Sequence, residues 1–157
     1  MQRLKRYDKI IAFVFGMLTI ILVVLAFTNV QFFEWAYERH QNILSWCIRP
    51  LFVIPYCYFA YKRSLAGIMG VILLVTTSMF WFPKPDVVSE QVKLFLEMEQ
   101  EYLMGDWGIA KWLIAALVPI SFIALGMAFW KRSLWVGLSV VVFMAVSKMA
   151  WSVLFGG

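Results

Sequence analysis

Five apolar segments, each about 18–24 residues long, dominate this 157-residue chain and are separated by short charged stretches. A helix rises about 1.5 Å per residue, so segments of this length can cross the ~30 Å hydrocarbon layer of a bilayer. The sequence is 63% hydrophobic, whereas soluble domains contain about 45–50% apolar residues. We therefore expect an all-α, polytopic integral membrane protein with five transmembrane helices. The predicted spans are residues 10–28, 42–61, 65–82, 107–130 and 134–154.

The stretches between these segments are too short to fold alone, so residues 1–157 are expected to form a single membrane domain. The first span follows the basic sequence QRLKRYDK, which resembles the start of a signal peptide. However, the apolar run exceeds the ~7–15 residues of a signal sequence, and no small-residue cleavage site follows it. We expect this segment to remain as the first helix.

Basic residues gather before the first span and after the second and fourth, whereas acidic residues predominate in the other connections. Because Lys and Arg mark cytoplasmic segments, this distribution predicts a cytoplasmic N-terminus and an extracytoplasmic C-terminus, most simply in the plasma (inner) membrane. The basic residues that give the net charge of +5 are then expected to form a band on the inner face that contacts membrane lipid. No nucleic-acid partner is expected. The basic residues are Arg3, Lys5, Arg6, Lys9, Lys62, Arg63, Lys131 and Arg132.

The sequence Lys-Arg-Ser-Leu occurs at 62–65 and again at 131–134, each time between two predicted spans. A short cytoplasmic turn favours basic residues for orientation and a serine to cap the next helix, so convergence explains the repeat. A parallel duplication of a helical hairpin explains it equally well. Both explanations remain open.

An amphipathic helix is predicted at residues 86–103, outside the membrane. Pro83 and Pro85 end the preceding span, and Asp86 is the expected N-cap. Apolar residues then recur at helical spacing opposite a strongly acidic face. Because membrane-surface helices usually carry a basic polar face, we expect this helix to cover the outer end of the bundle. A shorter amphipathic helix of the same kind is expected at residues 29–41.

Two cations lie inside predicted spans, Arg49 and Lys148, each about 20–24 Å along its helix from the nearest inner turn. A buried charge in a membrane requires a counter-charge or water, and Pro50 and Pro55 free backbone carbonyls near Arg49. One interpretation is an outward-facing ligand or ion site. The other is a structural pairing with outer acids. The candidate site residues are Arg49, Lys148, Glu97, Glu101, Glu34 and Glu38.

The remaining residues do not suggest catalysis. The chain has one histidine, His40, expected at the membrane interface, so no metal or haem site built from histidines is predicted. Cys47 and Cys57 are about 15 Å apart along one helix, too far for a disulfide. Ala66 and Gly70, four residues apart, predict a close packing surface within the bundle. We expect no enzyme activity, no cofactor and no metal.

The sequence therefore favours a transporter, channel or ligand-binding protein of the membrane with an outward-facing cationic site. The alternative is a structural or assembly subunit whose partner is another membrane protein or a second copy of this chain, because abundant aromatic and Met residues also suit a packing surface.

Overall fold

The computed structural model describes the backbone of residues 2–155 and the side chains of residues 7–102, 104–109, 111–147 and 149–150. Throughout this part of the chain the regular structure is helical, as predicted, with no strand. The contacts divide the chain into two compact units, Met1–Val88 and Ser89–Gly157. The prediction of one membrane domain stays a prediction.

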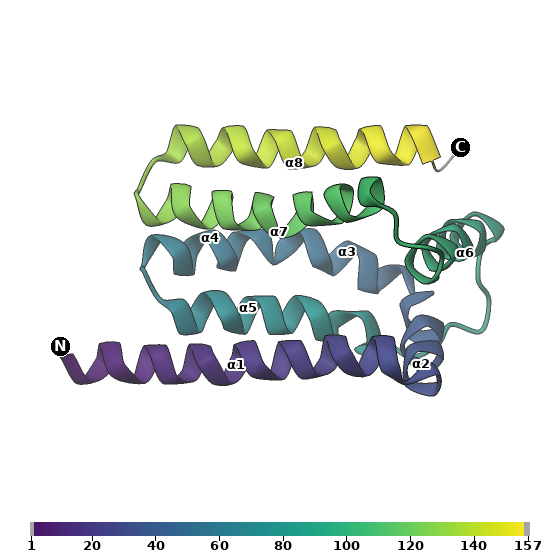
Figure 1. Cartoon of the computed structure of the whole chain (residues 1–157), viewed down its shortest axis with the longest axis horizontal. Helices are drawn as coiled ribbons and strands as arrows, with labels where there is room; N and C mark the ends of the chain where they lie inside the picture. The colour runs from purple at the N-terminus through teal and green to yellow at the C-terminus, as the bar shows by residue number, and fades with distance from the viewer. Residues whose placement is uncertain (1, 156–157) are drawn as a thin grey trace. The chain divides into compact units, whose positions relative to one another are not determined.

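The first unit contains a long N-terminal helix, a short helix that follows it, and an apolar helical hairpin (Figure 1). Its elements are α1 (Gln2–Thr28), α2 (Val30–His40), α3 (Ile43–Leu51), α4 (Val53–Tyr61), α5 (Leu65–Thr77) and the 3-10 helix η1 (Ser78–Phe80).

α1 lies alongside α5, and glycines on both helices allow the close approach (Figure 1). A Cβ at Gly16 of α1 would lie 3.1 Å from Met69 Cε, and one at Gly70 of α5 would lie 3.2 Å from Phe15 Cε2. Each glycine therefore receives a large side chain of the opposite helix. This contact confirms that Gly70 belongs to a packing surface inside the bundle.

The second predicted span is interrupted at Phe52, between α3 and α4. Pro50 and Pro55 lack the N–H groups that would continue the helical ladder, and the N–H of Phe52 donates to Arg49 O at 3.1 Å, a three-residue rather than a four-residue step. Phe52 keeps right-handed helical dihedral angles. The two helices therefore continue one another as a single apolar segment, Ile43–Tyr61.

The second unit consists of α6 (Glu90–Met104), α7 (Ile109–Trp130) and α8 (Leu134–Phe155). α7 and α8 lie side by side as an antiparallel hairpin (Figure 1). The predicted helix at 86–103 exists, but the prediction of Asp86 as its N-cap is wrong. Ser89 caps it instead, because the Ser89 hydroxyl accepts from Val92 N and the residues after Pro85 do not adopt helical structure.

The two Lys-Arg-Ser-Leu turns have the same backbone conformation. Arg63 has φ of 57° and Arg132 has φ of 59°, both in the left-handed region. In each turn the N–H of the following serine donates to the carbonyl five residues earlier, at 3.0 Å in the first copy and 2.9 Å in the second. This pattern is a Schellman motif, which usually places glycine where these arginines stand. Arginine in place of glycine adds a positive charge to the turn, as expected for a turn on the cytoplasmic side of a membrane.

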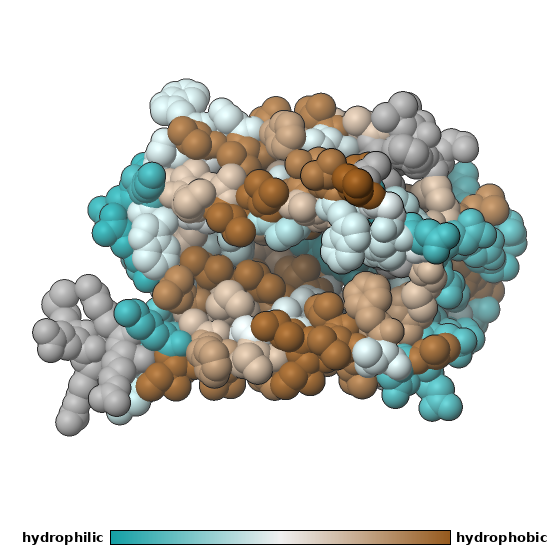
Figure 2. Space-filling view, in the orientation of Figure 1, coloured by the Kyte–Doolittle hydropathy of each residue, from teal (hydrophilic) through white to brown (hydrophobic). Residues whose placement is uncertain are grey.

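Three helices are long and apolar enough to cross a membrane: Tyr7–Thr28, Ile43–Tyr61 and Lys111–Trp130. Leu65–Phe80 and, within the described part of α8, Leu134–Ser147 are shorter apolar helices. Figure 2 shows apolar side chains along the helices and hydrophilic ones near their ends. The structure therefore fits the prediction of membrane-spanning helices at three of the five segments.

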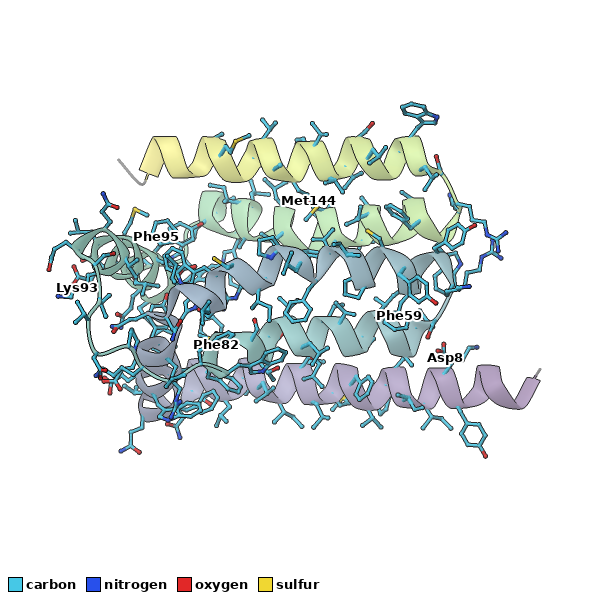
Figure 3. The ribbon with its side chains drawn as sticks, turned by 180° about the vertical axis from the view of Figure 1, so that it is seen from behind. Asp8, Phe59, Phe82, Lys93, Phe95 and Met144 are labelled. Carbon is cyan, nitrogen blue, oxygen red and sulfur yellow. The ribbon has the colours of Figure 1, made fainter. Side chains whose placement is uncertain are left out.

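Asp8, near the start of α1, holds the N-terminus of α5 (Figure 3). Its carboxylate accepts from Ser64 Oγ at 2.6 Å, from Leu65 N at 2.9 Å and from Ala66 N at 3.2 Å. Ser64 Oγ in turn accepts from Gly67 N at 3.1 Å. A carboxylate at this position satisfies the free N–H groups of the helix and complements its dipole. Asp8 thus connects the start of α1 to the start of α5.

Candidate functional site: an apolar cavity in the second unit

The second unit contains a cavity of about 580 Å³ bounded by α6, α7 and α8. Two of its side chains, Phe95 of α6 and Met144 of α8, are labelled in Figure 3. Most of the lining is aliphatic or aromatic. The lining residues are Phe95, Met98, Glu99, Tyr102, Trp107, Ile114, Ala115, Leu117, Val118, Ser121, Phe143, Met144 and Ser147.

Helical spacing places these side chains on common faces. Phe95, Glu99 and Tyr102 follow one another at intervals of four and three residues, so they share one side of α6. On α7, Ile114, Val118 and Ser121 follow in the same way, and the distance along the helix from first to last is about 10 Å. The cavity therefore extends along α7 from its beginning toward the middle of the helix.

Glu99 is the one acidic residue of the lining, and it is half-buried. Its neighbours on α6, Glu97 and Glu101, are exposed. Neither ion pair of the described residues, Lys84–Glu38 nor Lys93–Glu90, involves Glu99. The acid that α6 contributes to this cavity is therefore Glu99, whereas the acids of α6 predicted for a site were Glu97 and Glu101.

Lys111 places its ammonium on two aromatic side chains of the lining. The Lys111 Nζ lies 4.7 Å from the ring centroid of Tyr102 and 4.7 Å from that of Trp107. It also donates to Gly105 O at 3.0 Å, which fixes it at the turn between α6 and α7. Trp107 packs against Trp112 with 4.6 Å between ring centroids. Tyr102 and Trp107 therefore form an aromatic corner at the end of the cavity, and this corner holds the positive charge of Lys111.

In the first unit, Arg49 lies beside His40. Arg49 Nη1 is 3.3 Å from His40 Nε2, and His40 Nδ1 is 2.8 Å from Ser45 Oγ. Because a guanidinium can only donate, Nε2 accepts and the imidazole proton lies on Nδ1, which donates to Ser45. Ser45 Oγ donates onward to Asn42 O at 2.7 Å. The imidazole is therefore neutral in this arrangement.

His40 was expected at an interface, but its side chain is only 4% exposed and Ser45 is fully buried. The ring contacts Tyr37 edge-on and lies at a tilt against Trp46, whose Nε1 donates to His40 O at 2.8 Å. One pattern in the sequence indicates this cluster: Asn42, the N-cap of α3, is followed by Ser45 and Arg49 at intervals of three and four residues, which places them on one side of the helix.

The other candidate residues are distributed as follows. Glu38 forms an ion pair with Lys84 at 2.9 Å, so its nearest described cation is not Arg49. Glu34 is exposed on α2. The Lys148 side chain lies outside the described residues, although its backbone belongs to α8. A site that joins Arg49, Lys148, Glu97 and Glu101 stays a prediction.

Comparison with protein-family models, with curated proteins and with solved structures finds no match to this chain. The class of the protein therefore follows from its own features: a helical protein with candidate membrane spans and an apolar, aromatic-rich cavity bounded by three helices of one unit.

Proposed function

We propose that this chain is a five-span membrane protein, with its N-terminus in the cytoplasm, that binds a small apolar or lipid-like ligand in the cavity of the second unit. The observation that carries the proposal is the cavity itself. Its volume of about 580 Å³ falls inside the ~300–1,000 Å³ range of ligand pockets, which are mostly apolar with a few polar groups. Glu99, Tyr102, Ser121 and Ser147 supply those groups here.

Five spans are supported by helix length together with charge. Three helices meet the length and hydropathy of a span. α8 has 22 residues, about 33 Å at 1.5 Å per residue. The segment Leu65–Phe80 is shorter, about 24 Å, and such a helix is accommodated by local thinning of the bilayer. Both Lys-Arg turns and the basic N-terminus then face the cytoplasm.

The cavity is a better candidate than Arg49 for the ligand site of this protein. Arg49 is engaged with His40 in a hydrogen-bonded cluster, and a ligand there would have to replace those bonds, at a cost of about 1–3 kcal/mol for each group left unsatisfied. In contrast, the cavity side chains leave space already, and Ile114, Leu117, Val118 and Phe143 present large apolar surfaces beside it. Filling that space with an apolar ligand removes these surfaces from contact with water or lipid.

The test is to fill the cavity with a side chain. Val118 lines the cavity and is 61% exposed, and Ile123, on the same helix, is 58% exposed but does not line it. We expect the purified protein to bind the neutral fluorophore N-phenylnaphthylamine above the signal of protein-free micelles. Val118→Trp should weaken this binding by at least about tenfold, equivalent to 1.4 kcal/mol. Ile123→Trp should leave it unchanged.

Two results would count against ligand binding. Equal loss in both tryptophan variants would mean that the probe lies on the lipid-facing surface rather than in the cavity. No binding by the unmodified protein would leave the assembly-subunit interpretation as the better one.

A further inference from the structure

We propose that the cavity selects a lipophilic cation, meaning an apolar molecule that carries one positive charge, with Glu99 as its counter-charge. This inference rests on the proposed function, since it specifies the charge of the ligand that the same cavity binds. It depends on three observations: the position of Glu99, the aromatic side chains around it, and the place of Lys111.

Glu99 brings a carboxylate into an otherwise apolar lining. It shares one face of α6 with Phe95 and Tyr102, and all three line the cavity. A half-buried carboxylate interacts more strongly with an opposite charge than an exposed one, because the surrounding dielectric constant is lower. An apolar cation in the cavity would pair with Glu99 while its body contacts the lining.

The aromatic side chains strengthen the same preference. Phe95, Tyr102, Trp107 and Phe143 all line the cavity, and the face of an aromatic ring attracts a cation through its quadrupole. Neutral apolar ligands would gain only from packing against these rings. Glu99 would repel an anion in the cavity.

The position of Lys111 supports a preference of these aromatic rings for a cation. Its ammonium lies 4.7 Å from the centroids of both Tyr102 and Trp107, so two lining residues already bind an alkylammonium group. Four acidic residues lie between positions 97 and 106, and Lys111 is the next cation along the chain. Of these acidic residues, only Glu99 lines the cavity. The four are Glu97, Glu99, Glu101 and Asp106.

Lys111 therefore competes with the ligand for the aromatic corner. A ligand cation that approaches Tyr102 and Trp107 must displace the Lys111 ammonium or be repelled by it. Lys111 is also held by Gly105 O at 3.0 Å, so displacement costs this hydrogen bond. Removal of the Lys111 charge should then strengthen binding of a cation, whereas a site for anions would lose affinity.

Tetraphenylphosphonium and tetraphenylborate test the inference, because they have similar size and shape and opposite charge. We expect the protein in micelles of an uncharged detergent to bind the phosphonium at least about tenfold more tightly, measured by titration calorimetry against protein-free micelles. Glu99→Gln should weaken phosphonium binding by about tenfold, the effect of losing roughly 1.4 kcal/mol of charge pairing. It should weaken N-phenylnaphthylamine binding much less, because the neutral probe has no charge to pair with Glu99. Glu97→Gln, the matched control on the exposed side of α6, should change phosphonium binding by less than about threefold. Lys111→Gln should increase it.

Tighter binding of the borate, or an affinity for the phosphonium that Glu99→Gln does not change, would overturn the inference. Such a result with normal N-phenylnaphthylamine binding leaves the cavity as a ligand site and removes only its charge preference. If the protein binds none of the three compounds, the proposed function itself fails. A Tm of Glu99→Gln close to that of the unmodified protein shows that the variant has folded.

Discussion

Truncation of Asp8 should loosen the contact between α1 and the start of α5. In Asp8→Ala, the carboxylate that accepts from Ser64 Oγ, Leu65 N and Ala66 N is lost. The hydroxyl of Ser64 still accepts from Gly67 N, so α5 keeps one of its N-terminal hydrogen bonds. The variant therefore removes the long-range part of the cap and leaves the local part.

The expected cost follows from these contacts. Loss of a side-chain cap costs about 0.5–2 kcal/mol, and loss of a negative charge at a helix N-terminus costs a further ~0.3–1 kcal/mol. We expect Asp8→Ala to lower the free energy of unfolding by about 2 kcal/mol, which corresponds to roughly 4–8 °C in Tm for a chain of this size. Asp8→Asn keeps one acceptor oxygen, for Ser64 Oγ and Ala66 N, but replaces the oxygen that accepts from Leu65 N with an NH2 group. It should therefore lose the charge contribution, about 0.3–1 kcal/mol, and one of the three hydrogen bonds, which is less than the loss in Asp8→Ala.

Thermal unfolding in detergent, followed by tryptophan fluorescence, measures the global effect. Hydrogen exchange at the amides of Leu65 and Ala66 measures the local one, because these N–H groups bond directly to Asp8. Asp86→Ala, which removes an exposed acid from the non-helical segment before α6, is the control and should change neither. Unchanged Tm and unchanged exchange at both amides in Asp8→Ala would refute the cap.

Three further predictions address other parts of the account. A reporter active only in the cytoplasm should give no signal when fused after Gly157, because the proposed five spans with a cytoplasmic N-terminus would place that end outside. A strong signal would contradict the proposed span count. Gly67→Ala should destabilise the protein by about 1–3 kcal/mol, because the added Cβ would overlap the Phe59 ring. Adding Phe59→Leu to this variant should restore part of the lost free energy of unfolding. No loss in Gly67→Ala alone would contradict the packing. Arg49→Leu should lower the Tm, because it removes the guanidinium that donates to the buried His40 ring, at a cost of about 1–3 kcal/mol; an unchanged Tm would mean that this contact does not stabilise the fold.

The helices could be predicted from the sequence because their signals are long and local. Apolar length identified all five hydrophobic segments, and proline identified the weak point near Phe52. The N-cap of α6 was harder, since Asp86 and Ser89 are both good capping residues. Ser89 caps α6 because the segment after Pro85 stays non-helical for several residues, which depends on the path of the chain.

The cap by Asp8 could not be predicted, because its partners are more than 50 residues away in the sequence. Asp8 lies within the basic sequence QRLKRYDK, and its neighbours in the sequence give no sign that it caps another helix. Its role depends on the packing of α1 beside α5, and no local pattern in the sequence records that contact. The same limit applies to His40, which becomes buried by contacts with Trp46 and Tyr37.

The cavity was missed for a different reason. The acids of α6 were assigned together to one solvated face, although Phe95, Glu99 and Tyr102 follow at four and three residues and share a face with apolar neighbours. That spacing was available in the sequence and separates Glu99 from Glu97. What the sequence could not provide is the space beside these residues, which depends on how α6, α7 and α8 pack.

Photolabelling tests most directly whether the cavity is a ligand site. The protein in detergent would be irradiated with a neutral trifluoromethyl-phenyldiazirine, with and without an excess of N-phenylnaphthylamine, and the labelled residues identified by mass spectrometry. The account predicts that the excess compound suppresses labelling at residues 95–107, 114–121 and 143–147, while labelling along the exposed face of α1 persists. Equal suppression on α1 and in the second unit, or none anywhere, would contradict it.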